Sequence, residues 1–131
     1  MVIRKRTDVA RQPAVTVKLV PLIMKSQPWK PADATDEIRR MAKSPTLKLT
    51  YREHAIDQIK ERDLVIGDVL YALKNGFVYS DAQTTTKNNL FKYLMESNTP
   101  NSGNRAIRVV VIPDPERCWI KVLTVMWVDE K

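Results

Sequence analysis

The sequence contains very little cysteine, histidine or glycine, and these shortages exclude several kinds of site. Its 131 residues include one cysteine, Cys118, and one histidine, His54. A single cysteine forms no internal disulfide, and one cysteine and one histidine are too few ligands for a structural zinc site. Three glycines are too few for either common phosphate-binding glycine loop. We therefore expect no metal and no cofactor, in a reducing compartment.

Long apolar runs are also missing. The longest, Leu19 to Met24, is interrupted by Pro21 and is far shorter than the roughly 20 residues that cross a bilayer. No apolar segment precedes a small-residue cleavage site, so a secretory signal is not expected. Apolar residues still make up 44% of the chain, which is enough for one modest core. These features predict a soluble, cytoplasmic protein without a membrane partner.

The positive charge is concentrated near the N-terminus. The chain has 22 Lys and Arg against 15 Asp and Glu, a net charge of +7. Residues 1–31 hold seven basic residues and one acidic residue, whereas the 15 basic and 14 acidic residues of 32–131 contribute only +1. Four of the eight prolines also fall within the first 31 residues, where they interrupt helices and sheets. We expect a basic, partly flexible arm over 1–31 and a single domain over 32–131.

The arm has several interpretations. Arg4, Lys5 and Arg6 could contact the phosphates of RNA or an acidic partner. A solvated tail that only improves solubility would have a similar composition. An organellar transit peptide is a third interpretation, although the serine enrichment expected of one is missing. Residues 15–24 alternate well enough for one short edge strand, or for a strand formed against a partner.

Helices are predicted in the first part of the domain. The first is expected to start at Pro31, with Asp33 as its N-cap, and to stop at Ser44-Pro45. Thr50 and Glu53 have the spacing of a capping box, which predicts the start of a second helix. The second helix should end near residue 62.

A third helix and then strands follow. The third helix is expected to end at Gly76 in the left-handed conformation. A polar loop is predicted over 83–89 and a tight turn over 113–115. Strands are predicted over 77–82, 90–97, 105–112 and 118–128. This order predicts an α+β fold: a three- to four-stranded antiparallel sheet with two or three N-terminal helices on one face, plus the extended basic arm.

His54 is the most informative polar residue of the domain. It lies one turn into the second predicted helix, and Arg62 follows eight residues later on the same general side. A histidine transfers protons near neutral pH, and an arginine can hold a phosphate with two parallel hydrogen bonds. The pair therefore suits phosphodiester cleavage. The alternative is a surface histidine bonded to a neighbouring side chain.

Each of the three main strands carries a cation near its middle, namely Lys92, Arg108 and Lys121. A charge flanked by apolar residues must reach solvent or a partner, so we expect these cations on the open face of the sheet. Tyr93 and Thr124 add hydroxyl groups nearby. A basic sheet surface of this kind suits a nucleic-acid backbone, and ordinary solvent-facing alternation is the alternative. The strand register decides whether the cations cluster, and the sequence leaves it open.

Two tryptophans lie eight residues apart on the last predicted strand. Strict alternation places Trp119 and Trp127 on one face. Such aromatics form core contacts first and partner contacts second, so an oligomer through the last strand is a further expectation. Cys118 is interpreted as a small apolar filler at the start of that strand.

Several residues between Leu49 and Val128 resemble a known family pattern. They are Tyr51, His54-Ala55, Glu61-Arg62, Val69, Leu73, Gly76 and Val122-Leu123-Thr124-Val125. The pattern resembles the domain-of-unknown-function family 4258. That family is similar in turn to RelE-like and BrnT-like bacterial toxins, which are small mRNA endonucleases, free or ribosome-dependent, with a barnase–colicin–RelE type of fold.

The resemblance implies a toxin-like, metal-independent endoribonuclease, with RNA as its substrate and an antitoxin protein as a partner. It carries over His54 and Arg62 as catalytic residues, and Thr124 through the last-strand motif. Tyr93 is added to the predicted catalytic residues because of its place on a cation-bearing strand, not because of the resemblance. Lys92, Arg108 and Lys121 are predicted to bind RNA for the same reason. In the leading hypothesis His54 acts as general acid or base while Arg62, with Arg108 or Lys92, stabilises the phosphorane charge. The alternative is a non-catalytic nucleic-acid-binding or protein-interaction module with the same fold.

Overall fold

Three helices precede most of the sheet, in the order that the apolar patterns predict. The computed structural model describes residues 26–130. The helices are α1 (Pro31–Ala42), α2 (Glu53–Glu61) and α3 (Ile66–Asn75). The strands are β2 (Lys48–Tyr51), β3 (Phe77–Val78), β4 (Gln83–Thr84), β5 (Phe91–Asn98), β6 (Ala106–Asp114) and β7 (Trp119–Trp127). A short 3₁₀ helix, η2 (Pro115–Arg117), links β6 to β7. The α+β class is confirmed.

The sheet is larger than predicted, and it is mixed. Within the described residues its six strands run in the order β2-β7-β6-β5-β3, with β4 paired to β5 off this path. β2 pairs in parallel with the first half of β7, and the other pairs are antiparallel. The prediction of three or four antiparallel strands is therefore wrong. β2 and β4 are too short for an alternating pattern to reveal them, because only distant pairing makes them strands.

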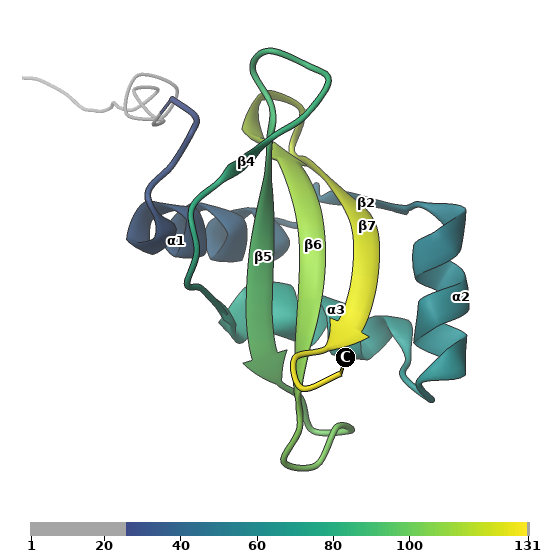
Figure 1. The fold of residues 1–131 in the computed structure, drawn as a ribbon. Coiled ribbons are helices and arrows are strands. Elements are labelled where there is room, and N and C mark those ends of the chain that lie inside the picture. Colours follow the sequence, from purple (N-terminus) through teal and green to yellow (C-terminus); the bar gives the residue numbers. More distant parts are fainter. Residues whose placement is uncertain (1–25, 131) are drawn as a thin grey trace, which may run out of the picture.

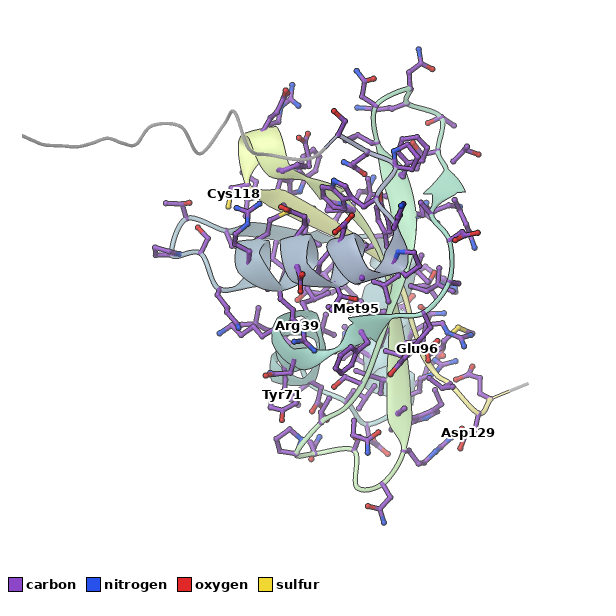
Figure 2. The ribbon with its side chains drawn as sticks, turned by 90° about the vertical axis from the view of Figure 1, so that its left-hand side faces the viewer. Arg39, Tyr71, Met95, Glu96, Cys118 and Asp129 are labelled. Atoms are coloured by element: carbon purple, nitrogen blue, oxygen red, sulfur yellow. The ribbon has the colours of Figure 1, made fainter. Side chains whose placement is uncertain are left out.

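The helices leave one face of the sheet open. α1 and α3 lie behind β5–β7 in Figure 1, while α2 packs against β7 at the side of the sheet. In Figure 2 the same two helices lie to the left of the vertical strands, and β4 with its loop lies to their right. The open face of β5–β7 is therefore bordered by the β4–β5 hairpin.

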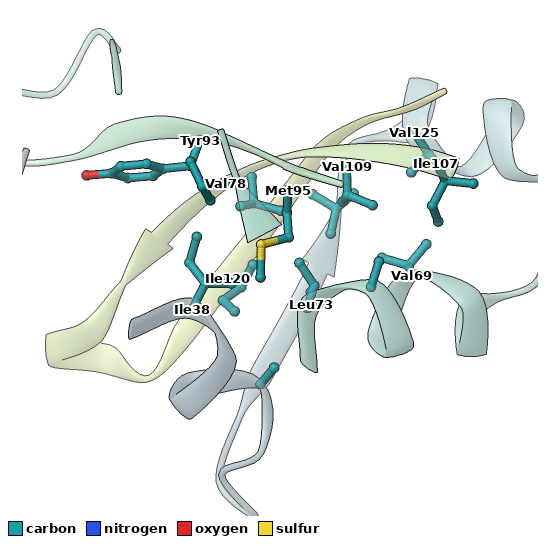
Figure 3. Packing of buried hydrophobic residues seen from close by; sticks show 14 of the residues in the cluster. Ile38, Val69, Leu73, Val78, Tyr93, Met95, Ile107, Val109, Ile120 and Val125 are labelled. Carbon is teal, nitrogen blue, oxygen red and sulfur yellow. The ribbon is translucent and has the colours of Figure 1, made fainter. Parts of the chain in front are cut away.

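The core fills the space between α1, α3 and the covered face (Figure 3). Alternate residues of the long strands point into it and are fully buried: Tyr93, Met95, Ile107, Val109, Val111, Ile120, Val122 and Val125. Ile38 of α1 and Val69 and Leu73 of α3 pack against them. The residues between these core positions, including Lys92 and Arg108, therefore occupy the open face.

The predicted helix starts are shifted. Thr50 belongs to β2, so its capping box with Glu53 does not form, and α2 follows Arg52 without a side-chain cap. Thr50 Oγ1 instead accepts a hydrogen bond from Trp119 Nε1 at 2.7 Å. Asp33 lies in the first turn of α1 rather than at its N-cap. Parallel pairing with β7 has overridden the local capping preference at residue 50.

The folded part begins before residue 32. Trp29 is only 3% exposed, and its ring stacks on Tyr93 with 5.4 Å between centroids. The Trp29 N–H donates to Tyr93 Oη at 3.0 Å, and that hydroxyl donates to Gln27 Oε1 at 3.1 Å. Residues 27–31 therefore belong to the domain, although their composition matches the arm. Arg4, Lys5, Arg6 and the strand predicted over 15–24 lie outside the described residues.

The ends of several strands also differ from the predictions. β3 covers only Phe77–Val78 of the strand expected over 77–82, and β4 lies inside the predicted loop over 83–89. β6 continues through Asp114, so the turn expected over 113–115 is replaced by η2. Short pairings at strand ends depend on what lies beside them, which local composition does not encode.

Gly76 ends α3 in an extended conformation, with φ −82° and ψ −172°, so the predicted left-handed stop is wrong. Its small size matters for a different reason. A Cβ at this position would lie 2.6 Å from the carbonyl oxygens of both Ala72 and Glu96. Glycine therefore lets the end of α3 approach β5 at backbone distance.

The substitution Gly76→Ala should destabilise the domain by about 1–3 kcal/mol, because two backbone carbonyls must move to admit the methyl group. Urea unfolding followed by circular dichroism measures this loss. Gly67→Ala is the matched control, since its Cβ would meet only Val65 Cγ2 at 3.9 Å and alanine favours helices. Equal losses in the two variants would contradict the close-approach explanation.

Candidate functional site

A β-bulge in β7 decides which side chains share the open face. β7 pairs with β6 so that Arg108 lies opposite Met126 and Ile112 lies opposite Lys121. Four positions separate the two β6 residues, but five separate the two β7 residues, and the register shifts between these pairs. The extra residue, Leu123, therefore brings Lys121 to the same face as Arg108.

Two of the predicted strand cations lie together on this face. Tyr93 pairs with Val111, which places its neighbour Lys92 beside Ile112, and Ile112 pairs with Lys121. The Cα atoms of the two lysines are thus two strand spacings apart, or about 10 Å. Flexible side chains of this length can reach one ligand from both sides.

A groove of about 360 Å³ lies over these positions, bounded by the β4–β5 loop and by Asp114 and Trp119, which lie at either end of the η2 turn. We call it the basic groove. Its cations come from four separate segments: Arg52, Lys87, Lys92 and Lys121. Its apolar lining comprises Leu90, Ile112 and Leu123, and threonines 84–86 form one side. The groove therefore combines positive charge, hydroxyl groups and an apolar surface.

A second, more open cavity of about 990 Å³ continues from the basic groove. Lys87, Asp114 and Trp119 line both cavities. Ser26, the first described residue, lines the second cavity, so the N-terminal segment joins the domain there.

Thr85 shapes the loop that borders the basic groove. Its hydroxyl donates to the carbonyl oxygen of Leu90 at 2.8 Å and accepts the Lys87 N–H at 3.1 Å. Such side-chain bonds replace backbone pairing in a tight loop. They hold Lys87 in place beside the groove.

The η2 turn shapes the opposite border. Asp114, only 4% exposed, accepts a hydrogen bond from Arg117 Nη1 at 2.7 Å. Cys118 has a φ of 48°, in the left-handed region, and the chain then enters β7. Cys118 therefore occupies a turn position rather than the first position of the strand, and Trp119 follows it at the groove.

Trp119 and Trp127 lie on opposite faces, so the prediction of a shared face is wrong. The bulge at Leu123 adds one residue between them and reverses the alternation. Trp127 lies opposite Ile107 and packs against the core, with Arg105 4.0 Å from its ring centroid. Trp119 lines the basic groove, a role that alternation did not indicate.

Arg62 does not line the basic groove. Its guanidinium forms two hydrogen bonds to the Glu130 carboxylate, Nε to Oε1 at 2.9 Å and Nη2 to Oε2 at 2.5 Å. The pair raises the pKa of Arg62 and lowers the pKa of Glu130 to about 2. Glu130 Oε1 also accepts the Trp127 N–H at 2.8 Å. Arg62 therefore ties the C-terminal end of the described chain to α2.

Arg108 and Thr124 lie on the open face but away from the groove. Arg108 Nε donates to Glu96 Oε2 on the neighbouring strand at 2.9 Å. Four residues, or about 13 Å of strand, separate it from Ile112 in the groove. Thr124 lies opposite Val110, between the two positions. Neither side chain lines the groove, so of the three strand cations only the two lysines cluster there.

Tyr93 faces the core. It is 1% exposed, and burial raises the pKa of its phenol. Its hydroxyl is bonded to the N-terminal segment through Trp29 and Gln27. Tyr93 and Lys92 are therefore neighbours in sequence that serve opposite faces of the sheet.

His54 is exposed on the first turn of α2, two residues after Arg52 of the groove. Gln58 follows His54 by four residues, on the same side of α2, and it is buried. Its Oε1 accepts the Val125 N–H at 2.9 Å. That bond attaches α2 to the edge of β7 beyond the end of β2. His54 does not line the groove.

Tyr51 is the first residue of the family-like pattern, and it faces the core. Its hydroxyl is buried and has no hydrogen-bond partner among residues 26–130. Burial raises its pKa to about 12, which keeps the phenol protonated.

Comparison with known proteins assigns most of the described chain to a family. Residues 51–127, from the end of β2 through β7, match the model of a family described as a domain of unknown function, DUF4258. The chain belongs to this family. Neither a curated protein nor a solved structure matches it. Arg52, Lys87, Lys92, Trp119 and Lys121 all lie within the matched range of this DUF4258 domain.

Within residues 26–130, no group of three or more His, Cys, Asp or Glu side chains is arranged to hold a metal ion. None of the helices in this range is long and apolar enough to cross a membrane.

The Arg62–Glu130 pair predicts a loss of stability in acid. Because the pKa of folded Glu130 is about 2, below its ordinary 4.5, the pair stabilises the fold above pH 4.5. This contribution is lost as the pH falls toward 2. Urea midpoints from about pH 5 to about pH 2.5 should fall less steeply for Glu130→Gln than for the parent. The control is Glu116→Gln, at an exposed position, and its urea midpoint should change with pH as the parent's does. If the midpoint of Glu130→Gln also changed with pH as the parent's does, the Arg62–Glu130 pair would not be the source of the acid sensitivity.

Proposed function

We propose that this DUF4258 domain binds RNA through its phosphates, with Lys92 and Lys121 of the basic groove as the main contacts. One observation carries the proposal. Four cations from separate segments line one concave surface, in a region of the chain, 32–131, whose net charge is only +1. Proteins hold nucleic-acid phosphates with lysine and arginine side chains in this way.

The pairing of the cations supports the same conclusion. Arg62, Arg108 and Arg117 each bond to a carboxylate. None of the groove cations has a carboxylate partner within 26–130. Unpaired cations around one surface repel one another, and Asp114, the carboxylate that also lines the groove, already bonds to Arg117. A phosphate group supplies the missing charge.

The basic N-terminal residues are a further source of phosphate contacts in this proposal. Arg4, Lys5 and Arg6 precede Ser26 in the sequence, and Ser26 lines the second cavity. These residues would add sequence-independent contacts to an RNA already held in the groove, and such contacts are weakened by salt.

The double variant Lys92→Gln/Lys121→Gln tests the groove. Each lost phosphate contact should reduce the slope of log affinity against log salt by about 0.7, so the double variant should lose about 1.4. Fluorescence anisotropy with a labelled RNA between about 50 and 200 mM salt measures this slope.

The matched control is Lys43→Gln/Lys60→Gln, which removes the same charge from two exposed positions, the C-cap of α1 and the last turn of α2. It should retain nearly the parent slope. If both double variants lose the same slope, net charge rather than the groove explains binding, and the proposed site is rejected.

A second candidate function is a toxin-like, metal-independent endoribonuclease that cleaves mRNA, free or on the ribosome, and is neutralised by an antitoxin. The exposed position of His54, two residues from Arg52 of the groove, favours it. The 2′-oxygen of the RNA would attack phosphorus, and the 5′-oxygen would leave, giving a cyclic phosphate. His54 would move the proton, and the groove lysines would stabilise the phosphorane charge.

Release of labelled fragments from RNA separates the two functions. Under the endoribonuclease hypothesis the parent cleaves RNA and arrests growth on expression, and His54→Gln loses at least about 100-fold in rate while still binding. RNA that stays intact at saturating protein would reject cleavage and leave the binding proposal in place.

A further inference from the structure

Trp119 occupies the junction of the two cavities. It lines the basic groove on one side and the more open cavity beside Ser26 on the other. Of the chain's three tryptophans, Trp29 is buried and Trp127 packs against the core, so Trp119 alone among them borders both cavities.

The orientation of Trp119 is set by the fold. Its Nε1–H donates to Thr50 Oγ1 at 2.7 Å, across the parallel pair of β2 and β7. The Cys118 carbonyl accepts the Lys48 N–H at 2.9 Å, which holds the start of β7 against β2. Because the polar edge of the indole is already bonded, what it offers a ligand is the apolar ring. A ring held in this way loses little entropy when a ligand stacks on it.

The cations lie on both sides of this ring. Lys92 and Lys121 line the basic groove, and Lys87 lines both cavities. Arg117, which is paired with Asp114, lines the second cavity together with Glu116, so among the described residues Lys87 is the unpaired cation on that side. An anionic chain that follows the cations from one cavity to the other must pass the indole. Successive nucleotides of a single strand carry one phosphate each, with a base between them that can stack on an aromatic ring.

We propose that the two cavities together hold single-stranded RNA, with one unpaired base stacked on Trp119 and its flanking phosphates in the two cavities. This inference rests on the proposed RNA binding and names the form of RNA that is bound. Duplex RNA keeps its bases paired and stacked inside the helix, so only its backbone would meet the lysines. Trp119 would therefore distinguish single strands from duplexes.

The test compares an unstructured RNA of about 12 nucleotides with the same strand annealed to its complement. Both are used with 2′-O-methyl riboses, so that cleavage through the 2′-hydroxyl cannot occur. The full-length parent should bind the single strand more tightly, and its tryptophan fluorescence should be quenched on binding. Trp119→Phe should abolish most of the quenching and keep most of the affinity, because a ring remains.

Trp119→Leu should lower single-strand affinity roughly five- to 150-fold, the range for loss of one base stack, with little change for the duplex. Thr50→Val removes the bond that orients the indole and should weaken single-strand binding by a smaller factor in the same direction. Thermal melts establish that each variant is folded before its affinity is compared.

The outcomes separate the two proposals. The stacking role of Trp119 would be overturned if the parent bound both RNA forms with equal affinity and without quenching. If Lys92→Gln/Lys121→Gln still lowered the salt slope in that case, the basic groove would stand as the binding site. Equal losses for duplex and single strand in Trp119→Leu would likewise overturn the stacking role, since they would indicate a structural role alone. No binding of either form by the parent would overturn both proposals.

Discussion

The β-bulge at Leu123 is the constraint on which the open face depends. Five positions, an odd number, separate Lys121 from Met126, so strict alternation would place one of them on the core face. Burying a lysine in the core would cost a large free energy. One extra residue resolves the conflict by reversing the alternation within β7. It brings Lys121 to the side of Lys92, places Trp119 at the groove and sends Trp127 to the core.

Pairing divides the basic residues into two groups with different roles. Arg62 secures the chain near its C-terminal end, Arg108 bridges two strands through Glu96, and Arg117 bonds to the buried Asp114. These charges are neutralised where they lie, and they contribute to the fold. The groove cations line a concave surface without carboxylate partners in the described part of the chain, which is why a ligand with negative charge fits there.

Much of the family pattern has a structural explanation in this domain. Ala55, Val69 and Leu73 are buried, Gly76 permits a close backbone approach, and Arg62 anchors the chain. These residues lie within the range matched to DUF4258, and here they hold α2, α3 and the strands together. Function has to be argued from the groove, whose side chains the same framework positions.

The sequence by itself determined the α+β class, the three helices and the long strands, because apolar periodicity over eight or more residues is the strongest local signal of secondary structure. It also singled out Lys92, Arg108 and Lys121, since cations within apolar strands must avoid the core, but it left open which of them cluster. Only the tertiary structure decided that β2 pairs in parallel with β7, that Arg62 bonds to Glu130, and that Trp119 borders the groove. These outcomes depend on residues dozens of positions apart and on a one-residue shift in register, neither of which leaves a local pattern.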